Sequence, residues 1–223
     1  MNDETDFDKL MRFVLELRQG GVTDARVLAA MERTPRAHFA PEQFKAFAME
    51  DRALPLPDGE FMTKPSTVAR VLAALELRGG ETVLEVGTGS GYQAAALATI
   101  ARRVVSLERR IALAAEARAR IGQLRLMHVY VHAADGADGW AEDAPYDAIV
   151  VNAAIGTPSP TEMKQLASGG VLVAPVVGEN GQRLMQFRKG ADGSFVARDL
   201  GPAQFAPMAR GLVADATGKT AGE

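Results

Sequence analysis

The chain has 223 residues, of which 47% are hydrophobic and 24% are charged. These proportions are ordinary for a globular protein, organised as one α/β domain or as one domain with a small appendage. The net charge of −3 argues against a protein that binds nucleic acid through a basic surface. The absence of cysteine excludes disulfides, thiolate–zinc sites and a cysteine nucleophile.

Membrane insertion, secretion and metal binding find no support in the sequence. The segment from Met1 to Asp6 is acidic where a secretory signal is basic, and no apolar run approaches the ~20 residues that span a bilayer. The three histidines, at positions 38, 128 and 132, are scattered along the chain. We therefore expect a cytoplasmic protein with no metal, membrane or nucleic-acid partner.

The first third of the chain predicts helices and then a loop. Apolar residues fall at helical spacing from Leu10 to Leu17, Thr23 is placed to cap a second helix, and a third short helix begins near Pro41. Prolines in residues 53–65 disfavour a regular element and indicate an ordered loop or lid. Residues 1–65 are interpreted as a helical N-terminal cap with a substrate loop.

Residues 66–211 alternate between helix and strand patterns, beginning with a helix from Ser66 to about Leu77. The expected strands are 82–86, 103–107, 128–131, 146–151 and 171–176, with helices at 92–101, 111–121 and about 161–166. This alternation predicts right-handed crossovers and a parallel sheet covered on both faces. Two further runs, 182–189 and 195–200, flank a hairpin turn. The expected fold is a seven-stranded, Rossmann-like α/β sheet that ends in an antiparallel hairpin, with residues 212–223 as a flexible tail.

The strongest local signal lies where the strand 82–86 gives way to a helix. Its Gly-x-Gly-x-Gly spacing differs from the Gly-x-Gly-x-x-Gly of a dinucleotide fingerprint, and no phosphate-binding lysine follows. Glycines let a backbone approach a ligand closely, and the following helix offers free N–H groups. We expect this loop to hold S-adenosyl-L-methionine, which carries no phosphate, with a carboxylate near its ammonium group. The expected contacts are Glu85, Gly87, Thr88, Gly89, Ser90, Gly91, Tyr92 and Gln93.

Two acidic residues follow the next strands. Glu108 ends the second strand, the position from which an acidic side chain accepts the ribose hydroxyls in such folds. Asp135 and Gly136 end the third strand and are expected at the adenine amino group. Because the carboxyl ends of parallel strands meet at one edge of a sheet, the three groups predict one cofactor site.

Several segments outside this loop resemble the protein-L-isoaspartate O-methyltransferase family, over about residues 27–207. The resemblance is carried by residues 31–39, 48–55, 83–97, 135–140, 145–151, 166–175 and 201–207. It implies an S-adenosylmethionine-dependent methyltransferase that methylates the α-carboxylate of isoaspartyl residues in damaged proteins, for repair. The damaged proteins or peptides are then the expected partners.

The sequence departs from the family pattern on the acceptor side. The family usually has serine, then glutamine or alanine, before the proline at position 65, where this chain has Thr63 and Lys64. Thr63 keeps a hydroxyl donor with a stiffer rotamer, and we expect it to be the catalytic residue. The family usually has threonine or serine at position 152, and residues 152–157 also differ. The expected substrate-binding residues are Thr63, Lys64, Asn152, Ala153 and Ala154.

Three alternatives follow from these departures and from the glycine loop. In the first alternative the chain is an S-adenosylmethionine enzyme with a different acceptor. In the second it is a non-catalytic protein that binds the cofactor, and in the third it is a nicotinamide-dependent dehydrogenase. The last is disfavoured by Tyr92, which stands where a dinucleotide fingerprint has its third glycine, and by the terminal hairpin.

Overall fold

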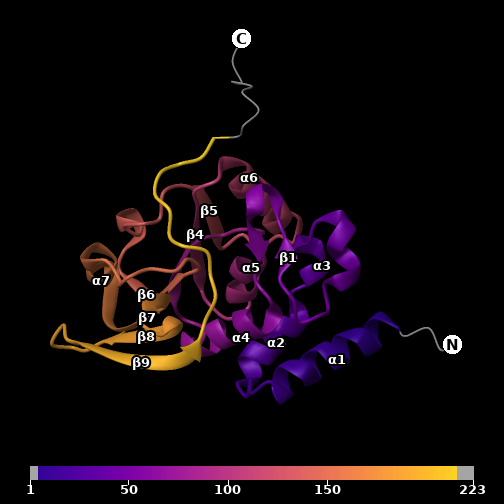
Figure 1. Ribbon diagram of the computed structural model, residues 1–223, viewed down its shortest axis with the longest axis horizontal. Coiled ribbons are helices and arrows are strands. Elements are labelled where there is room, and N and C mark those ends of the chain that lie inside the picture. The colour runs from indigo at the N-terminus through magenta and orange to yellow at the C-terminus, as the bar shows by residue number, and fades with distance from the viewer. Residues whose placement is uncertain (1–4, 215–223) are drawn as a thin grey trace, which may run out of the picture.

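The computed structural model describes residues 5–214 and contains the expected seven-stranded sheet (Figure 1). Its strands are β3 (Thr82–Val86), β4 (Arg103–Glu108), β5 (Val129–Ala133), β6 (Tyr146–Val151), β7 (Leu166–Gly178), β8 (Gly181–Lys189) and β9 (Phe195–Pro202). They lie in the order β5-β4-β3-β6-β7-β8-β9. The first five pair in parallel, whereas β8 is antiparallel to both β7 and β9. The predicted parallel sheet with an antiparallel end is confirmed.

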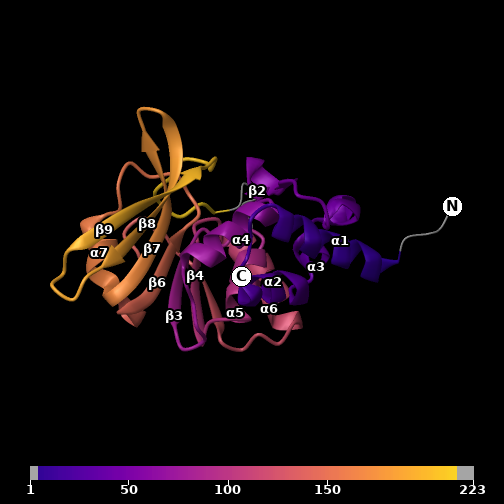
Figure 2. The ribbon, with the colours of Figure 1, turned by 90° about the horizontal axis from the view of Figure 1, so that it is seen from below.

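The helices gather mainly on one side of the sheet (Figure 2). They are α1 (Asp6–Gln19), α2 (Ala25–Arg33), α3 (Arg36–Phe39), α4 (Pro65–Ala74), α5 (Tyr92–Ala98), α6 (Ile111–Gln123) and α7 (Pro160–Gln165), with short 3-10 turns η1 (Glu42–Phe47), η2 (Pro57–Gly59) and η3 (Ala141–Asp143). Helices α1 to α6 lie over one face, whereas α7 packs on the other. Within the part of the chain described, no helix is long and apolar enough to cross a bilayer.

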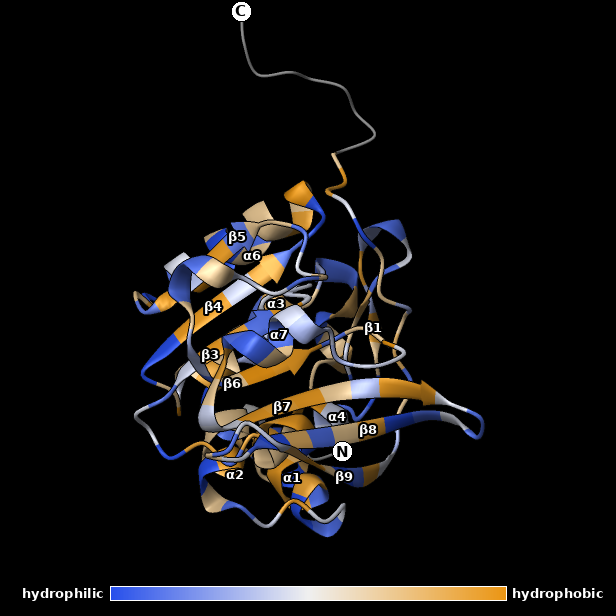
Figure 3. Cartoon of the chain, turned by 90° about the vertical axis from the view of Figure 1, so that its left-hand side faces the viewer, coloured by the Kyte–Doolittle hydropathy of each residue, from blue (hydrophilic) through white to orange (hydrophobic). Residues whose placement is uncertain are grey.

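Alternate residues of the central strands point to opposite faces and form two hydrophobic clusters. Val83 and Val104 face the helical side, whereas Leu84 and Val105 face the side of α7. Figure 3 shows β6 and β7 as apolar along most of their length and β8 as more hydrophilic. A strand buried on both faces needs this continuous apolar run, which is why the sequence located the central strands well.

The N-terminal cap differs from the prediction in three details. The side chain that caps α2 is that of Asp24, not Thr23, and it accepts the Arg26 N–H at 2.8 Å. The third helix is a 3-10 turn, and α3 precedes it. Residues 53–65, expected as a loop, contain a two-stranded hairpin of β1 (Leu54–Pro55) and β2 (Phe61–Met62). Two-residue strands leave no periodic pattern in the sequence.

After β9 the chain returns across the carboxyl ends of the parallel strands (Figure 1, yellow). We call residues 203–214 the C-terminal strap. The strap pairs with the core through bridges from Pro207 to Ala154 and from Val213 to Arg110. The predicted flexible tail lies mostly outside the described residues, since 215–223 are not described, and Val213 is held by backbone hydrogen bonds to Arg109 and Ile111.

Candidate active site

The glycine loop between β3 and α5 has the backbone shape that its sequence requires. Gly87, Gly89 and Gly91 all have positive φ, at 92°, 53° and 90°. A Cβ on Gly87 would lie 3.2 Å from the Asn152 Cβ, so this glycine permits close approach of the loop to the end of β6. A Cβ on Gly91 would meet Ala117 at 3.2 Å, so Gly91 serves the packing of α5 on α6.

A cavity lies above this loop at the carboxyl ends of the parallel strands, and we call it the cofactor cavity. Of the predicted cofactor residues, its lining contains Gly87, Thr88, Gly89, Ser90, Tyr92, Gln93, Glu108 and Gly136. Three predicted residues, Glu85, Gly91 and Asp135, are not part of the lining. The strap closes one side of the cavity with residues 206–209, which sequence reasoning did not identify as part of the site.

Glu108 is the last residue of β4, at the strand end expected from the sequence, and its contact with the ribose stays a prediction. Its side chain is in the lining, and the residue is only 6% exposed. One carboxylate oxygen accepts the Gly89 N–H at 2.8 Å, and the other accepts the Arg110 N–H at 2.9 Å. A carboxylate has about four lone-pair positions, so each oxygen keeps capacity for a ligand hydroxyl. Glu108 therefore both orders the glycine loop and presents an acceptor to the cavity.

Glu85 is completely buried beneath the loop. Ser106 donates its hydroxyl to one carboxylate oxygen at 2.6 Å, and the Asn152 amide donates to the other at 3.2 Å. Burial raises the pKa of Glu85 from 4.5 to about 8, although hydrogen bonds from Ser106 and Asn152 act to lower it. The structure thus places Glu85 behind the cavity wall, in a position to support the loop rather than to line the site.

Asp135 holds the strap in place. One carboxylate oxygen accepts the Ala137 N–H at 3.0 Å, and the other accepts the Gly211 N–H at 2.6 Å. Its neighbour Gly136 does line the cavity, and a Cβ there would lie 2.6 Å from a Val86 methyl group. The carboxylate therefore lies beside the cavity, with each oxygen already accepting a backbone N–H, and its contact with the adenine amino group stays a prediction.

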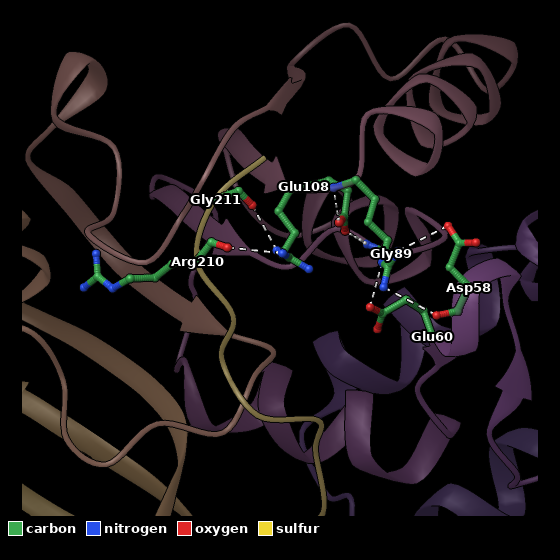
Figure 4. A network of polar contacts seen from close by, with 8 residues as sticks. Asp58, Glu60, Gly89, Glu108, Arg210 and Gly211 are labelled. Carbon is green, nitrogen blue, oxygen red and sulfur yellow. Dashed lines mark hydrogen bonds and ion pairs between the residues drawn. The ribbon is translucent and has the colours of Figure 1, made fainter. Parts of the chain in front are cut away.

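Arg109 and Arg110, directly after Glu108, reach in two directions. Figure 4 shows their partners on opposite sides of Glu108, with Arg210 and Gly211 on one side and Asp58 and Glu60 on the other. Arg109 donates to the carbonyl oxygens of Gly211 and Arg210 in the strap, at 3.1 and 3.2 Å. Arg110 pairs with Glu60 at 2.9 Å and with Asp58 at 3.2 Å, both in the β1–β2 loop. A single stretch at the end of β4 thus fixes both covers of the cofactor cavity.

Replacing Arg110 by alanine is expected to loosen the β1–β2 loop and to speed cofactor release. The Arg110 side chain is only 19% exposed, so its two ion pairs are worth about 1 kcal/mol together, or roughly a fivefold faster dissociation. Stopped-flow displacement of S-adenosylhomocysteine measures this rate. Arg188→Ala, which breaks an exposed pair with Glu76, is the control. An unchanged rate in Arg110→Ala would show that the loop does not gate release.

The predicted acceptor residues surround a second cavity, which we call the acceptor cavity. Thr63 and Asn152 line both cavities, whereas Ala153 lines only the cofactor cavity and Lys64 only the acceptor cavity. The acceptor cavity is otherwise bounded by the α1–α2 turn, the start of α4 and residues 202–206. Thr63 therefore stands in the wall that the two cavities share.

The remaining acceptor candidates are largely engaged within the protein. The Asn152 amide donates to Glu85 and to the Gly87 carbonyl oxygen and accepts from Gln93 at 3.0 Å, so its side chain braces the cofactor loop. The Ala154 N–H and carbonyl group pair with the strap, at 2.7 and 2.8 Å. Lys64 is half-exposed, with its ammonium 3.8 Å from Asp51.

Comparisons with known proteins give the site its context. Residues 8–212 match the protein-L-isoaspartate(D-aspartate) O-methyltransferase family. The chain belongs to this family. It is 44% identical over 203 residues to a protein-L-isoaspartate O-methyltransferase of Maricaulis maris, covering 91% of this chain and 95% of the relative. It is also 44% identical to one of Methylorubrum populi, with coverages of 93% and 98%.

Solved structures agree with this membership. A protein-L-isoaspartate O-methyltransferase matches with a TM-score of 0.81 at 25% identity, covering 91% of this chain and 67% of the other. A beta-aspartate methyltransferase of Plasmodium falciparum, in complex with S-adenosyl-L-homocysteine, matches with a TM-score of 0.76 at 19% identity, covering 89% and 97%; it shows a shared fold.

Like its family, the chain is a methyltransferase that depends on S-adenosyl-L-methionine. The cavity fits this cofactor, because its floor is a glycine backbone that leaves room beside Asn152 and its edge carries the Glu108 carboxylate. Among residues 5–214, no group of three or more metal-ligating side chains comes together.

Proposed function

We propose that this methyltransferase esterifies the α-carboxylate of isoaspartyl residues in damaged proteins, with Thr63 as the residue that holds the acceptor. The observation that carries the proposal is the place of Thr63, in the wall common to the cofactor and acceptor cavities. No hydrogen bond ties its hydroxyl to the rest of the described chain, which leaves this donor for a ligand. A cytoplasmic location remains a prediction from the sequence.

The proposed chemistry asks little of the protein beyond placement. A carboxylate acceptor is already ionised at about pH 7, so no general base is required. Bound S-adenosylmethionine supplies an electrophilic methyl group on a positively charged sulfur. The chain contributes by removing water and aligning the acceptor, for which residues 206–209 of the strap and the β1–β2 loop cover the cavity.

Lys64 differs from the family pattern without opposing the proposed reaction. Its ammonium lies near Asp51, and the residue lines the acceptor cavity but not the cofactor cavity. We infer that Lys64 attracts an anionic acceptor through its charge and does not hold the reacting carboxylate. Salt screens such a long-range interaction strongly, whereas it screens a direct contact to a buried carboxylate much less.

The Thr63→Ala variant tests the proposal. Loss of a hydroxyl donor to a charged acceptor costs about 1.5–3 kcal/mol, so kcat/KM for an isoaspartyl peptide is expected to fall roughly 10- to 100-fold. Thr63→Ser keeps the donor and is expected to stay within about threefold of the parent. Thr67→Ala, in the same cavity wall, is the matched control. Equal activity of Thr63→Ala and the parent would remove Thr63 from the acceptor site.

A further inference from the structure

Arg36 is a fully buried cation that forms no ion pair with any carboxylate of the described chain. The residue is 1% exposed, at the start of α3. Its guanidinium donates to four backbone carbonyl oxygens: those of Ala48 at 2.9 Å, Glu50 at 3.3 Å, Arg52 at 2.8 Å and Thr63 at 3.2 Å. The buried Nε has no hydrogen-bond partner in the described chain, so the charge depends on the four carbonyl groups that the two terminal nitrogens reach and requires a specific backbone geometry there.

The four carbonyl groups belong to two segments that have no regular hydrogen-bond ladder of their own. Residues 48–52 form turns and bends after η1, and Thr63 lies between β2 and α4. The two segments also touch through Asp51, which accepts the Ser66 N–H at 2.7 Å. Arg36 is thus a shared donor that holds the segment around Thr63 against residues 48–52.

The guanidinium also contacts a residue that lines the cofactor cavity. The Tyr92 ring lies 5.8 Å from the Arg36 guanidinium carbon, and Tyr92 lines that cavity. Burial lowers the pKa of Arg36 to about 10, while the nearby Tyr92 and Asp51 act to raise it, so the group stays charged near neutral pH. Arg36 therefore contacts two residues that line the cofactor cavity, Tyr92 and Thr63, without lining the cavity itself.

We propose that Arg36 is a positioning residue: by holding the Thr63 carbonyl group, it sets where the Thr63 hydroxyl stands relative to the cofactor cavity. This inference rests on the proposed role of Thr63. It goes beyond that role because Arg36 touches no substrate and lines neither cavity.

The planar fork of Arg36 explains why another cation would not replace it. A guanidinium offers five N–H donors in a fixed plane and can span carbonyl groups from two segments. An ammonium is a compact point donor and reaches only part of that set. Arg36→Lys should therefore keep part of the order around Thr63 and part of the substrate affinity that Arg36→Gln loses.

The test compares Arg36→Gln and Arg36→Lys with the parent. Arg118→Lys is the control, since Arg118 also donates to a carbonyl oxygen, that of Val131, away from both cavities. Urea titrations first define conditions in which every variant is folded. Hydrogen exchange of residues 61–66, the KM for an isoaspartyl peptide and the Kd of S-adenosylhomocysteine are then measured.

For Arg36→Gln we expect faster exchange at 61–66, a KM about tenfold higher and an S-adenosylhomocysteine Kd within about threefold of the parent. Arg36→Lys should give exchange rates and a KM between those of Arg36→Gln and the parent, and Arg118→Lys should match the parent. Unchanged exchange at 61–66, or a Kd that rises as much as the KM, would overturn the inference. If the parent enzyme is inactive on the peptide, the proposed function is contradicted instead. The exchange data would then still show whether Arg36 holds the segment around Thr63.

Discussion

The Glu108→Ala variant is expected to bind S-adenosylhomocysteine roughly a hundredfold more weakly than the parent, a loss of about 3 kcal/mol. The carboxylate lines the cavity and already accepts N–H groups from Gly89 and Arg110. Truncation removes the predicted ribose acceptor and also leaves the Gly89 N–H, in the middle of the glycine loop, without its partner. Both effects weaken the same binding step.

Calorimetric titration with S-adenosylhomocysteine measures the loss. Glu108→Gln retains one oxygen acceptor and should bind with intermediate affinity, because an amide accepts about half as strongly as a carboxylate. Glu116→Ala removes an exposed carboxylate on α6 that pairs with Arg120, and it serves as the control. Parent-like affinity in Glu108→Ala would show that the cofactor does not use this strand end.

The Glu85→Gln variant is expected to remove the loss of stability with rising pH that Glu85 causes in the cofactor-free protein. Burial raises the pKa of Glu85 to about 8, so the folded state keeps the proton after the unfolded state has lost it. The stability that Glu85 contributes is therefore present below pH 4.5 and is lost as the pH rises toward about 8. The effect amounts to a few kcal/mol at most. Glutamine keeps the side-chain shape and has no proton to lose.

Urea unfolding between about pH 5 and pH 9 measures this difference. The difference between the free energy of unfolding of the variant and that of the parent should increase in favour of the variant as the pH rises. Glu81→Gln is the control: burial acts to raise the pKa of Glu81, but N–H donors of Gly79 and Arg78 hold it below its ordinary 4.5, so this carboxyl is ionised in both states above about pH 5 and the variant should run parallel to the parent. Parallel curves for Glu85→Gln and the parent would mean that Glu85 is ionised in the folded protein.

The sequence predicted the sheet and the cofactor loop well because both depend on local patterns. β3 and β6 coincide with the predicted 82–86 and 146–151, since buried parallel strands read as continuous apolar runs. The glycine loop requires positive φ at three positions, and glycine is the residue that adopts it without strain. Glu108 followed from the same logic, because parallel strands end at one edge of the sheet.

Residues 53–65 were predicted as a loop or lid, but the strap and the contacts that hold both covers of the site were not predicted, because they join distant residues. Arg109 and Arg110 hold the strap and the β1–β2 loop, segments that lie far from them in the sequence. Arg36 belongs to a segment that carried the family resemblance, but its four carbonyl partners lie 12 to 27 residues away. A sequence pattern does not show which carbonyl groups will surround a buried guanidinium.

Asp135 illustrates the same limit at a single residue. Its place at the end of β5 was predicted, and the adjacent Gly136 lines the cavity. That its carboxylate accepts the Gly211 N–H depends on the return of the strap, 76 residues later. The sequence shows where a strand ends. It does not show which distant segment will contact a side chain at that end, and this contact decides what the side chain binds.

The most direct test of the account is transfer of labelled methyl from S-adenosylmethionine to two peptides that differ only in an aspartyl linkage. With the isoaspartyl peptide we predict base-labile label that depends on Thr63, and with the normal aspartyl peptide we predict none. Tight binding of S-adenosylhomocysteine with no label in either peptide, or equal labelling of both, would contradict the proposed function.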